Sequence, residues 1–255
     1  MKQSEYLKIL NMSKRTLEEY LNWGESEVPN VASDKEPMTK KQSVIKKDIQ
    51  GKFSKNTLGS KEKLEVLKKK IDFCVDCPLG KSRLNAVIGV GSPNADLMFV
   101  GEGPGFDEDH KGEPFVGKAG QLLTKIIEAM GFTRETVYIA NIVKCHPMID
   151  PANPEKRSND RPPTSIEMET CRHYLDKQIE IIKPKIIVAL GASSTKGLSY
   201  TEETISKIRG IIKEYNGIKL MPTYHPAALL RNPNLKKSVW NDMKRVMRYL
   251  STGEI

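Results

Sequence analysis

Four short apolar runs recur along the chain, and each is bounded by residues that form turns. They are "ADLMFVG" (95–101), "TVYIANIVKC" (136–145), "PKIIVALG" (184–191) and "IKLMPTYHP" (218–226). Short runs rich in branched and aromatic residues are typical of strands that are buried on both faces. The pattern therefore predicts four buried strands.

Helical patterns lie between these runs. In residues 117–131 apolar side chains recur every three or four positions, and Gly131 stands where a helix would end. In residues 164–184 the spacing of Thr164 and Glu167 fits a capping box at a helix start. Alternating strands and helices predict an α/β fold with a mainly parallel sheet, helices on both faces and functional loops at the carboxyl ends of the strands.

The N-terminal quarter has a different composition. We expect a short helical element at 1–27, a basic flexible linker at 28–60 rich in Lys, Ser, Pro and Asn, and a folded domain at 61–255. Residues 1–70 carry 16 Lys or Arg against 10 Asp or Glu, so most of the net charge of +9 lies there. Such a segment is typical of a solvated linker, although it also attracts phosphates.

The chain has no apolar run near the roughly 18 residues that a membrane span needs, and its N-terminus lacks a signal-peptide core. We therefore expect a cytoplasmic protein of prokaryotic type, a monomer without membrane contact. The positive charge is compatible with a polyanionic partner but does not identify one.

The four cysteines form one close pair and two single positions. Cys74 and Cys77 make a C-x-x-C, and Cys145 and Cys171 follow far downstream. This is neither the repeated pair of a zinc ribbon nor a thioredoxin-like setting. Four thiolates suit either zinc or an iron–sulfur cluster, and spacing alone does not choose between them. The adjacent Gly-Lys-Ser is no phosphate loop, because Val75 stands where that pattern needs glycine.

Several residues could form a ligand site at the carboxyl ends of the strands. The loop at 101–109 has three glycines, so backbone amides can approach a ligand there, but Phe106 replaces the third glycine of a dinucleotide fingerprint. Phe115 could offer an aromatic face, Asn141 could read one edge of a base, and His225 could stabilise an anion. Residues of these types more often have a structural role in the core than a role in ligand binding.

The segment "AALLR" (227–231) follows His225 and could act as an apolar wedge next to a basic helix. A solvated face is an equally good interpretation of that helix. Its basic residues are Lys236, Lys237, Lys244, Arg245 and Arg248.

Motifs spread over the chain resemble the family 4 uracil-DNA glycosylases, the iron–sulfur members of the uracil-DNA glycosylase superfamily. The similar segments run in order from about Phe73 to Leu250. They are "GEGPGFDEDHKGEPFVGKAGQLL", "YIANIVKCHP", "METCRHYL", "KIIVALGA" and "YHPAALLR".

This resemblance implies a three-layer α/β/α sandwich around a four-stranded parallel sheet, and a structural 4Fe-4S cluster on Cys74, Cys77, Cys145 and Cys171. It also implies the partner and the reaction. The partner is single- or double-stranded DNA that contains uracil, and the enzyme initiates base-excision repair by hydrolysing the N-glycosidic bond of a flipped uracil to leave an abasic site.

The resemblance further implies roles for single residues. Phe115 would stack on the uracil, and Asn141 would read its N3–H and O4. Glu108 would lie against C5 and exclude the methyl group of thymine. Glu102 and Gly103 would line the loop that faces the base and the scissile bond.

His225 would donate a hydrogen bond to O2 as negative charge builds on the leaving uracil. Leu229, Leu230 and Arg231 would contact DNA. Gly103 stands where a better-known family has an aspartate that activates water, so a dissociative reaction is expected. The loop at 148–165 departs from the family in its length. Its Lys156, Arg157 and Arg161 could contact DNA or be solvated, and we expect a solvated loop that shields the cluster.

A different class of protein also accounts for part of the pattern. A zinc-stapled nucleic-acid-binding module without catalysis would explain the cysteines and the charge, but it would leave Phe115, Asn141 and His225 without a task.

Overall fold

The computed structural model describes residues 58–199 and 201–254. The residues from Gly59 onward form a compact unit of their own. The predicted helical element at 1–27 and nearly all of the predicted linker at 28–60 lie outside the described residues. Within the described ranges, no helix is both long and apolar enough to cross a membrane.

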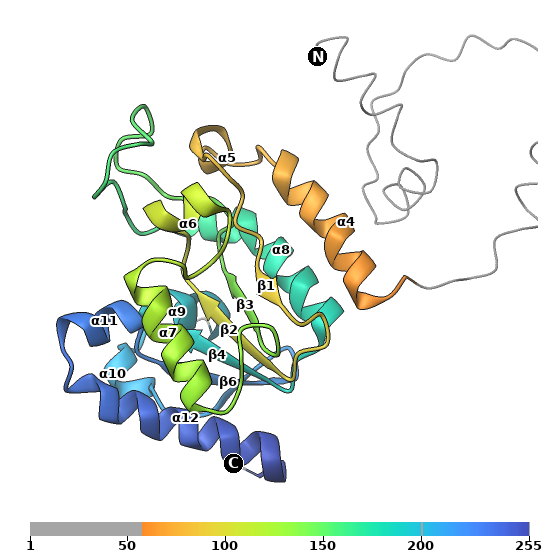
Figure 1. The fold of residues 1–255 in the computed structure, drawn as a ribbon, viewed down its shortest axis with the longest axis vertical. Helices are drawn as coiled ribbons and strands as arrows, with labels where there is room; N and C mark the ends of the chain where they lie inside the picture. The colour runs from red at the N-terminus through yellow and green to blue at the C-terminus, as the bar shows by residue number, and fades with distance from the viewer. Residues whose placement is uncertain (1–57, 200, 255) are drawn as a thin grey trace, which may run out of the picture. The chain divides into compact units, whose positions relative to one another are not determined.

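A six-stranded sheet forms the centre of this unit, with the strand order β1-β3-β2-β4-β6-β5 (Figure 1). The four inner strands are parallel to one another, and the two edge strands are antiparallel to their neighbours. The inner strands are β2 (Leu97–Gly101), β3 (Tyr138–Asn141), β4 (Ile186–Leu190) and β6 (Ile218–Thr223), and the edge strands are β1 (Val90–Gly91) and β5 (Lys213–Tyr215). The four predicted parallel strands are therefore confirmed, and the two short edge strands are additions.

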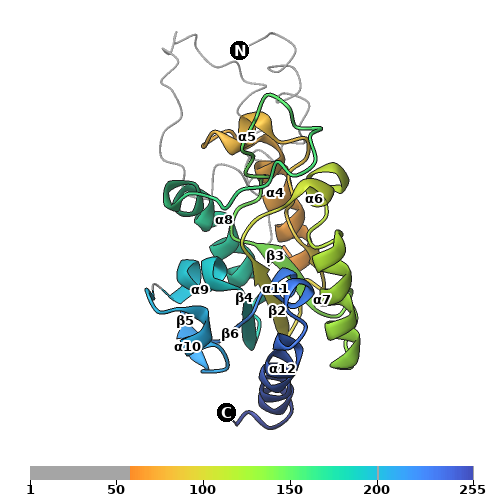
Figure 2. The same ribbon diagram turned by 90° about the vertical axis from the view of Figure 1, so that its left-hand side faces the viewer.

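Helices cover both faces of the sheet, as the three-layer prediction requires. Figure 2 shows α7 and α12 on one side and α8 and α9 on the other. The helices are α4 (Ser60–Phe73), α5 (Leu79–Ser82), α6 (Phe106–Lys111), α7 (Lys118–Ala129), α8 (Ser165–Ile182), α9 (Ala192–Ser199), α10 (Ile205–Ile208), α11 (Pro226–Arg231) and α12 (Leu235–Thr252).

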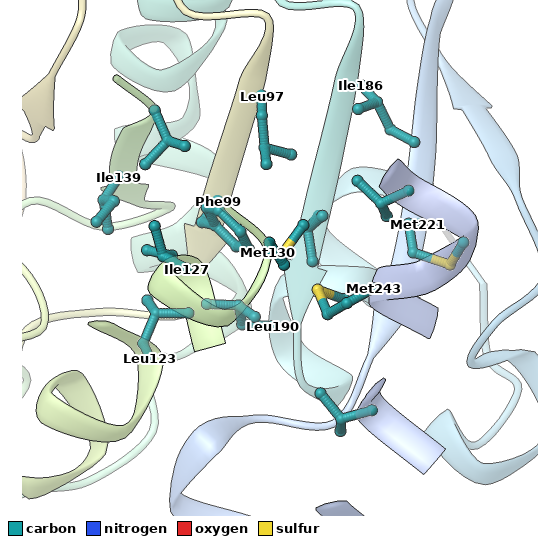
Figure 3. Packing of buried hydrophobic residues seen from close by; sticks show 14 of the residues in the cluster. Leu97, Phe99, Leu123, Ile127, Met130, Ile139, Ile186, Leu190, Met221 and Met243 are labelled. Atoms are coloured by element: carbon teal, nitrogen blue, oxygen red, sulfur yellow. The ribbon is translucent and has the colours of Figure 1, made fainter. Parts of the chain in front are cut away.

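The main core lies between the sheet and the layer formed by α7 and α12. Side chains alternate along β2, so that Leu97 and Phe99 point into this core, where they meet Leu123 and Ile127 of α7 and Met243 of α12 (Figure 3). All five side chains are almost completely buried. This packing fixes where the carboxyl ends of the strands lie.

The predicted signals at the helix ends are present. The Thr164 hydroxyl accepts a hydrogen bond from the Glu167 amide, and the Glu167 carboxylate accepts one from the Thr164 amide. These reciprocal bonds satisfy amides that the first turn of α8 leaves unpaired. At the end of α7, Gly131 has a φ of +83°, which glycine adopts without the penalty that a Cβ brings.

Because the four inner strands are parallel, their carboxyl ends meet at one edge of the sheet. The residues there are Gly101, Asn141, Leu190 and Thr223. The segments that follow them carry the candidate residues Glu102, Gly103 and His225.

Candidate active site

Gly101, Phe115 and Asn141 meet at the carboxyl ends of β2 and β3. A Cβ atom on Gly101 would lie 2.3 Å from the Oδ1 of Asn141, and 2.5 Å from the Cζ of Phe115. Real Cβ atoms do not make contacts that close. Glycine at this position therefore lets an aromatic ring and an amide oxygen approach the same point.

Asn141 is the last residue of β3, at its carboxyl end rather than in mid-strand. The next two amides continue the pairing with the β2 segment, because Ile142 N donates to Gly101 O and Val143 N donates to Glu102 O. The Asn141 side chain is 2% exposed, and its Oδ1 has no hydrogen-bond partner among the described residues. A buried, unpaired amide oxygen is costly, so it indicates a group that a ligand completes.

Phe115 has a φ of +55°, in the left-handed region that residues with a side chain rarely adopt. Its ring is 7% exposed. The Arg134 guanidinium donates to the carbonyl oxygens of Pro114 (2.7 Å) and Phe115 (3.2 Å). These hydrogen bonds hold one side of the turn that carries the ring.

Glu108 holds the other side of this turn. Its Oε1 accepts hydrogen bonds from the amides of Val116 (2.9 Å) and Gly117 (3.0 Å), and its Oε2 accepts one from Gly105 (3.2 Å). Both carboxylate oxygens thus bind backbone amides. A role of Glu108 against C5 of a base stays a prediction.

His225 is the N-cap of α11, and its Nδ1 accepts a hydrogen bond from the Ala227 amide (3.1 Å). A neutral imidazole that accepts at Nδ1 carries its proton on Nε2, which is then a donor. Burial, together with the charge of Arg231, lowers the pKa of His225 to about 4, so the ring is neutral near pH 7. Its centroid lies 5.7 Å from that of the Phe115 ring.

Glu102 and Gly103 follow directly after β2. The Oε1 of Glu102 is buried and has no hydrogen-bond partner among the residues that the structure describes. A Cβ on Gly103 would lie 2.6 Å from the Cγ2 of Val143, so a larger residue would have to displace that side chain. The contact with Val143 thus favours glycine at position 103, where a better-known family has an aspartate.

The segment predicted to contact DNA, Leu229 to Arg231, has one buried and two exposed side chains. Leu229 is 2% exposed and packs in the core with residues of α7 and α12, so its proposed contact with DNA is wrong for this conformation. It anchors α11 instead. Leu230 is 48% exposed and Arg231 is exposed, so these two are accessible to a partner.

Comparisons with known proteins agree with this geometry. The family model described as "Uracil DNA glycosylase superfamily" matches residues 88–244. The chain belongs to the uracil-DNA glycosylase superfamily.

Curated relatives narrow the position within the superfamily to its type-4 members, as the sequence motifs predicted. A type-4 uracil-DNA glycosylase from Sulfurisphaera tokodaii is 45% identical over 196 residues, which cover 72% of this chain and 84% of the relative. Relatives of the same description from Saccharolobus solfataricus and Thermotoga maritima are 42% and 41% identical. These two alignments cover 76% and 74% of this chain, and 89% and 95% of the relatives.

The four cysteines of this superfamily member line one small cavity. Cys74 and Cys77 lie between α4 and α5, Cys145 follows β3, and Cys171 is on α8. All four are free thiols. In residues 58–199 and 201–254, no group of three or more His, Cys, Asp or Glu is arranged to hold a single metal ion.

A guanidinium and a backbone amide donate hydrogen bonds to two of the cysteine sulfurs. The Arg83 guanidinium lies 3.0 Å from the Sγ of Cys145, and the Lys144 amide donates to the Sγ of Cys171 (3.4 Å). Burial raises the pKa of Cys145 to about 12 and that of Cys171 to about 11, although Arg83 and Lys144 oppose the rise. Hydrogen bonds to sulfur are typical of thiolates that hold a cluster.

The loop at 148–165 lies against α6 rather than over the cysteines, and none of its residues lines the cysteine cavity. Arg157 stacks on Phe106, and Glu155 binds His110. Asp160 accepts from the Phe106 amide and lies 2.7 Å from the Nε2 of His146. The predicted shielding of the cluster by this loop therefore has no support in the structure.

Sequence reasoning did not single out Asp109, Arg134, Lys144 or His146. Asp109 is fully buried, accepts from the amides of Leu84 and Asn85, and lies 3.4 Å from the Nδ1 of His146. A polar residue inside an apolar run was the available signal for Lys144. For Asp109 and Arg134 the partners are backbone groups distant in sequence, which no local pattern reveals.

Proposed function

We propose that this chain excises uracil from DNA by hydrolysing the N-glycosidic bond, which leaves free uracil and an abasic site as the first step of base-excision repair. The observation that carries the proposal is the buried Oδ1 of Asn141, which has no partner in the part of the chain that the structure describes and lies beside the Phe115 ring, next to a glycine that leaves room for both. Membership in the superfamily supports the same activity.

Asn141 is the group that reads the base. Its Oδ1 accepts from N3–H of uracil, and its amide nitrogen donates to O4. Cytosine presents an unprotonated N3 and an amino group at these two positions, so it would leave the buried amide unpaired on both sides. Because a base inside a duplex cannot reach a residue that is 2% exposed, the nucleotide must first be flipped out.

His225 stabilises the leaving group. The Ala227 amide occupies Nδ1, so that Nε2–H is free to donate to uracil O2. A neutral donor strengthens its hydrogen bond as negative charge develops on O2, and it keeps its own proton. This is the behaviour that a dissociative cleavage requires.

The attacking water has two candidate neighbours in the loop after β2. Gly103 offers no side chain, and its contact with Val143 leaves little space for one. Glu102 has a buried carboxylate oxygen without a hydrogen-bond partner among the described residues, so it is the candidate to hold water or to balance the positive charge on the sugar. Phe115 covers the base face, while Leu230 and Arg231 contact the DNA strand.

The four cysteines that line one cavity support a 4Fe-4S cluster, for which Cys74, Cys77, Cys145 and Cys171 would be the ligands. Four cysteine thiols around one cavity, without an arrangement for a metal ion among the described residues, would suit such a cluster. When bound, the cluster supplies a structural cross-link rather than a reaction step. The four cysteines would then connect the segment after α4, the segment after β3 and the helix α8.

One experiment tests the function and one tests the cofactor. An oligonucleotide with a single uracil should break at that position after incubation with the enzyme and treatment with alkali, whereas the thymine-containing control should stay intact. Anaerobically purified protein should be brown and contain about four iron atoms per chain. A colourless protein with stoichiometric zinc and no cleavage would instead identify the non-catalytic binding module.

A further inference from the structure

The turn that carries Phe115 needs an external restraint. A phenylalanine at φ +55° is in a sparsely populated conformation that persists only where its surroundings impose it. An altered backbone would rotate the ring away from Gly101 and Asn141, which it now meets at close range. The restraint on this turn therefore determines whether the ring faces the base.

Two side chains of opposite charge supply that restraint from two sides. The Arg134 guanidinium donates to the two carbonyls before the turn, those of Pro114 and Phe115. The Glu108 carboxylate accepts from the two amides after it, those of Val116 and Gly117. Charge-assisted hydrogen bonds are shorter and stronger than neutral ones, and in each of these bonds one partner is an ionic side chain and the other a backbone group.

Each of these two side chains is itself held in place. The Glu108 Oε2 accepts from the Gly105 amide at the start of α6, so its carboxylate cannot turn away without losing that bond. Arg134 also donates to the Oγ1 of Thr124 on α7 (3.3 Å). The backbone of α7 packs against the turn as well, since a Cβ on Gly120 would lie 1.9 Å from the Phe115 carbonyl oxygen.

We propose that Glu108 and Arg134 are positioning residues that act through Phe115, and that together they fix its left-handed turn so that the ring stacks on the flipped base. This inference rests on the proposed uracil excision. It gives Glu108 a task different from the one that the family resemblance implied, because both of its oxygens are bound to backbone amides and not aimed at a base. Loss of this carboxylate should therefore slow the removal of uracil without admitting thymine.

The test is a double-mutant cycle measured by single-turnover cleavage of a uracil oligonucleotide. Glu108→Gln and Arg134→Gln should each slow cleavage by about 10- to 100-fold in the wild-type background. In a Phe115→Leu background the same changes should cost less than about twofold, because the ring through which they act is gone. Glu128→Gln makes the same chemical change at an exposed position of α7 and should have no effect in either background.

Two further measurements keep the result interpretable. Arg134→Lys keeps the positive charge but loses the paired donors, and it should fall between the wild type and Arg134→Gln. The inhibition constant of free uracil should rise in Glu108→Gln and stay constant in Glu128→Gln. If Glu108→Gln only lowered stability, the inhibition constant of the folded fraction would not change.

Several outcomes would overturn the inference. They are an unchanged rate in Glu108→Gln, equal losses with and without the Phe115 ring, or removal of thymine by the Glu108 variant. If the wild-type enzyme did not cleave uracil at all, the proposed function would fail first, and this inference with it.

Discussion

The ammonium group of Lys144 donates a 2.6 Å hydrogen bond to the backbone carbonyl of Asn141, the residue proposed to read the base. A second 2.6 Å bond joins the same ammonium to the Oε1 of Gln178 on α8. Gln178 in turn donates to Ile88 O and to the hydroxyl of Tyr138 on β3. Lys144 also precedes a cavity-lining cysteine, so one buried polar network connects the cysteine cavity to the base-reading end of β3.

We predict that Lys144→Met destabilises the protein by about 2 kcal/mol, because it removes the donor and leaves two buried acceptors, at Asn141 and Gln178, unpaired. Thermal unfolding measures this. The exposed Lys125→Met on α7 is the matched control and should stay within about 0.5 kcal/mol of the wild type. Equal melting temperatures for the two variants would argue against the network.

We predict that Gly101→Ala abolishes most activity, by about 100-fold or more, because the new Cβ occupies the point that the Phe115 ring and the Asn141 oxygen share. The steady-state and single-turnover rates on a uracil oligonucleotide measure it. Gly131→Ala is a contrasting control, since its φ of +83° imposes strain but nothing lies within 4 Å of the added atom. It should lower stability and leave the cleavage rate intact.

We predict that His225→Ala slows single-turnover cleavage by about 100-fold or more, since one donor to a developing anion is worth roughly 2.7 to 4 kcal/mol. The binding of uracil-containing DNA should change far less than the rate. A variant that cleaves at the wild-type rate would remove His225 from the reaction.

The pH dependence provides a separate check on His225. Its folded-state pKa of about 4 lies below the ordinary value of 6.5, so the ring stays neutral across pH 5 to 8 and the rate should show no step near 6.5 from this group. The unfolded chain takes up this proton near pH 6.5, so the free energy of unfolding falls as the pH drops from 6.5 toward 4. A rate step at pH 6.5 that vanishes in His225→Ala would contradict the neutral assignment.

We predict that Asn141→Asp changes the choice of base. A carboxylate only accepts hydrogen bonds, so it pairs with N3–H of uracil but repels O4, and it pairs with the amino group of cytosine but repels N3. The fixed donor and acceptor that favour uracil are therefore lost. The ratio of uracil to cytosine excision, measured on paired oligonucleotides, should fall. An unaltered ratio, with both rates reduced equally, would assign Asn141 a structural task only.

The sequence predicted those parts of the fold that local patterns encode. The four inner strands, the capping box at Thr164 and the glycine after α7 all follow from apolar periodicity and turn chemistry within a few residues. The edge strands β1 and β5, of two and three residues, are too short to produce such a pattern, and the helix α4, at the start of the expected folded domain, was not predicted. Their pairing partners lie elsewhere in the chain.

The sequence predicted which residues belong to the candidate site, but not how these residues are arranged in space. Motif similarity named Phe115, Asn141 and His225, and the structure brings these three together. Motif similarity could not show that Leu229 faces the core or that the Glu108 oxygens bind backbone amides, because both depend on how α7 and α11 pack. Burial of single side chains is a tertiary property.

The most direct test of the account is cleavage of a DNA duplex that carries one uracil opposite guanine, with alkali to reveal the abasic site. The wild-type enzyme should break the strand at the uracil, and Asn141→Ala, at the same concentration and with the same melting temperature, should do so at least about 100-fold more slowly. No break with the wild type, or equal rates for the two proteins, would contradict the proposal that a buried amide at the end of β3 reads uracil.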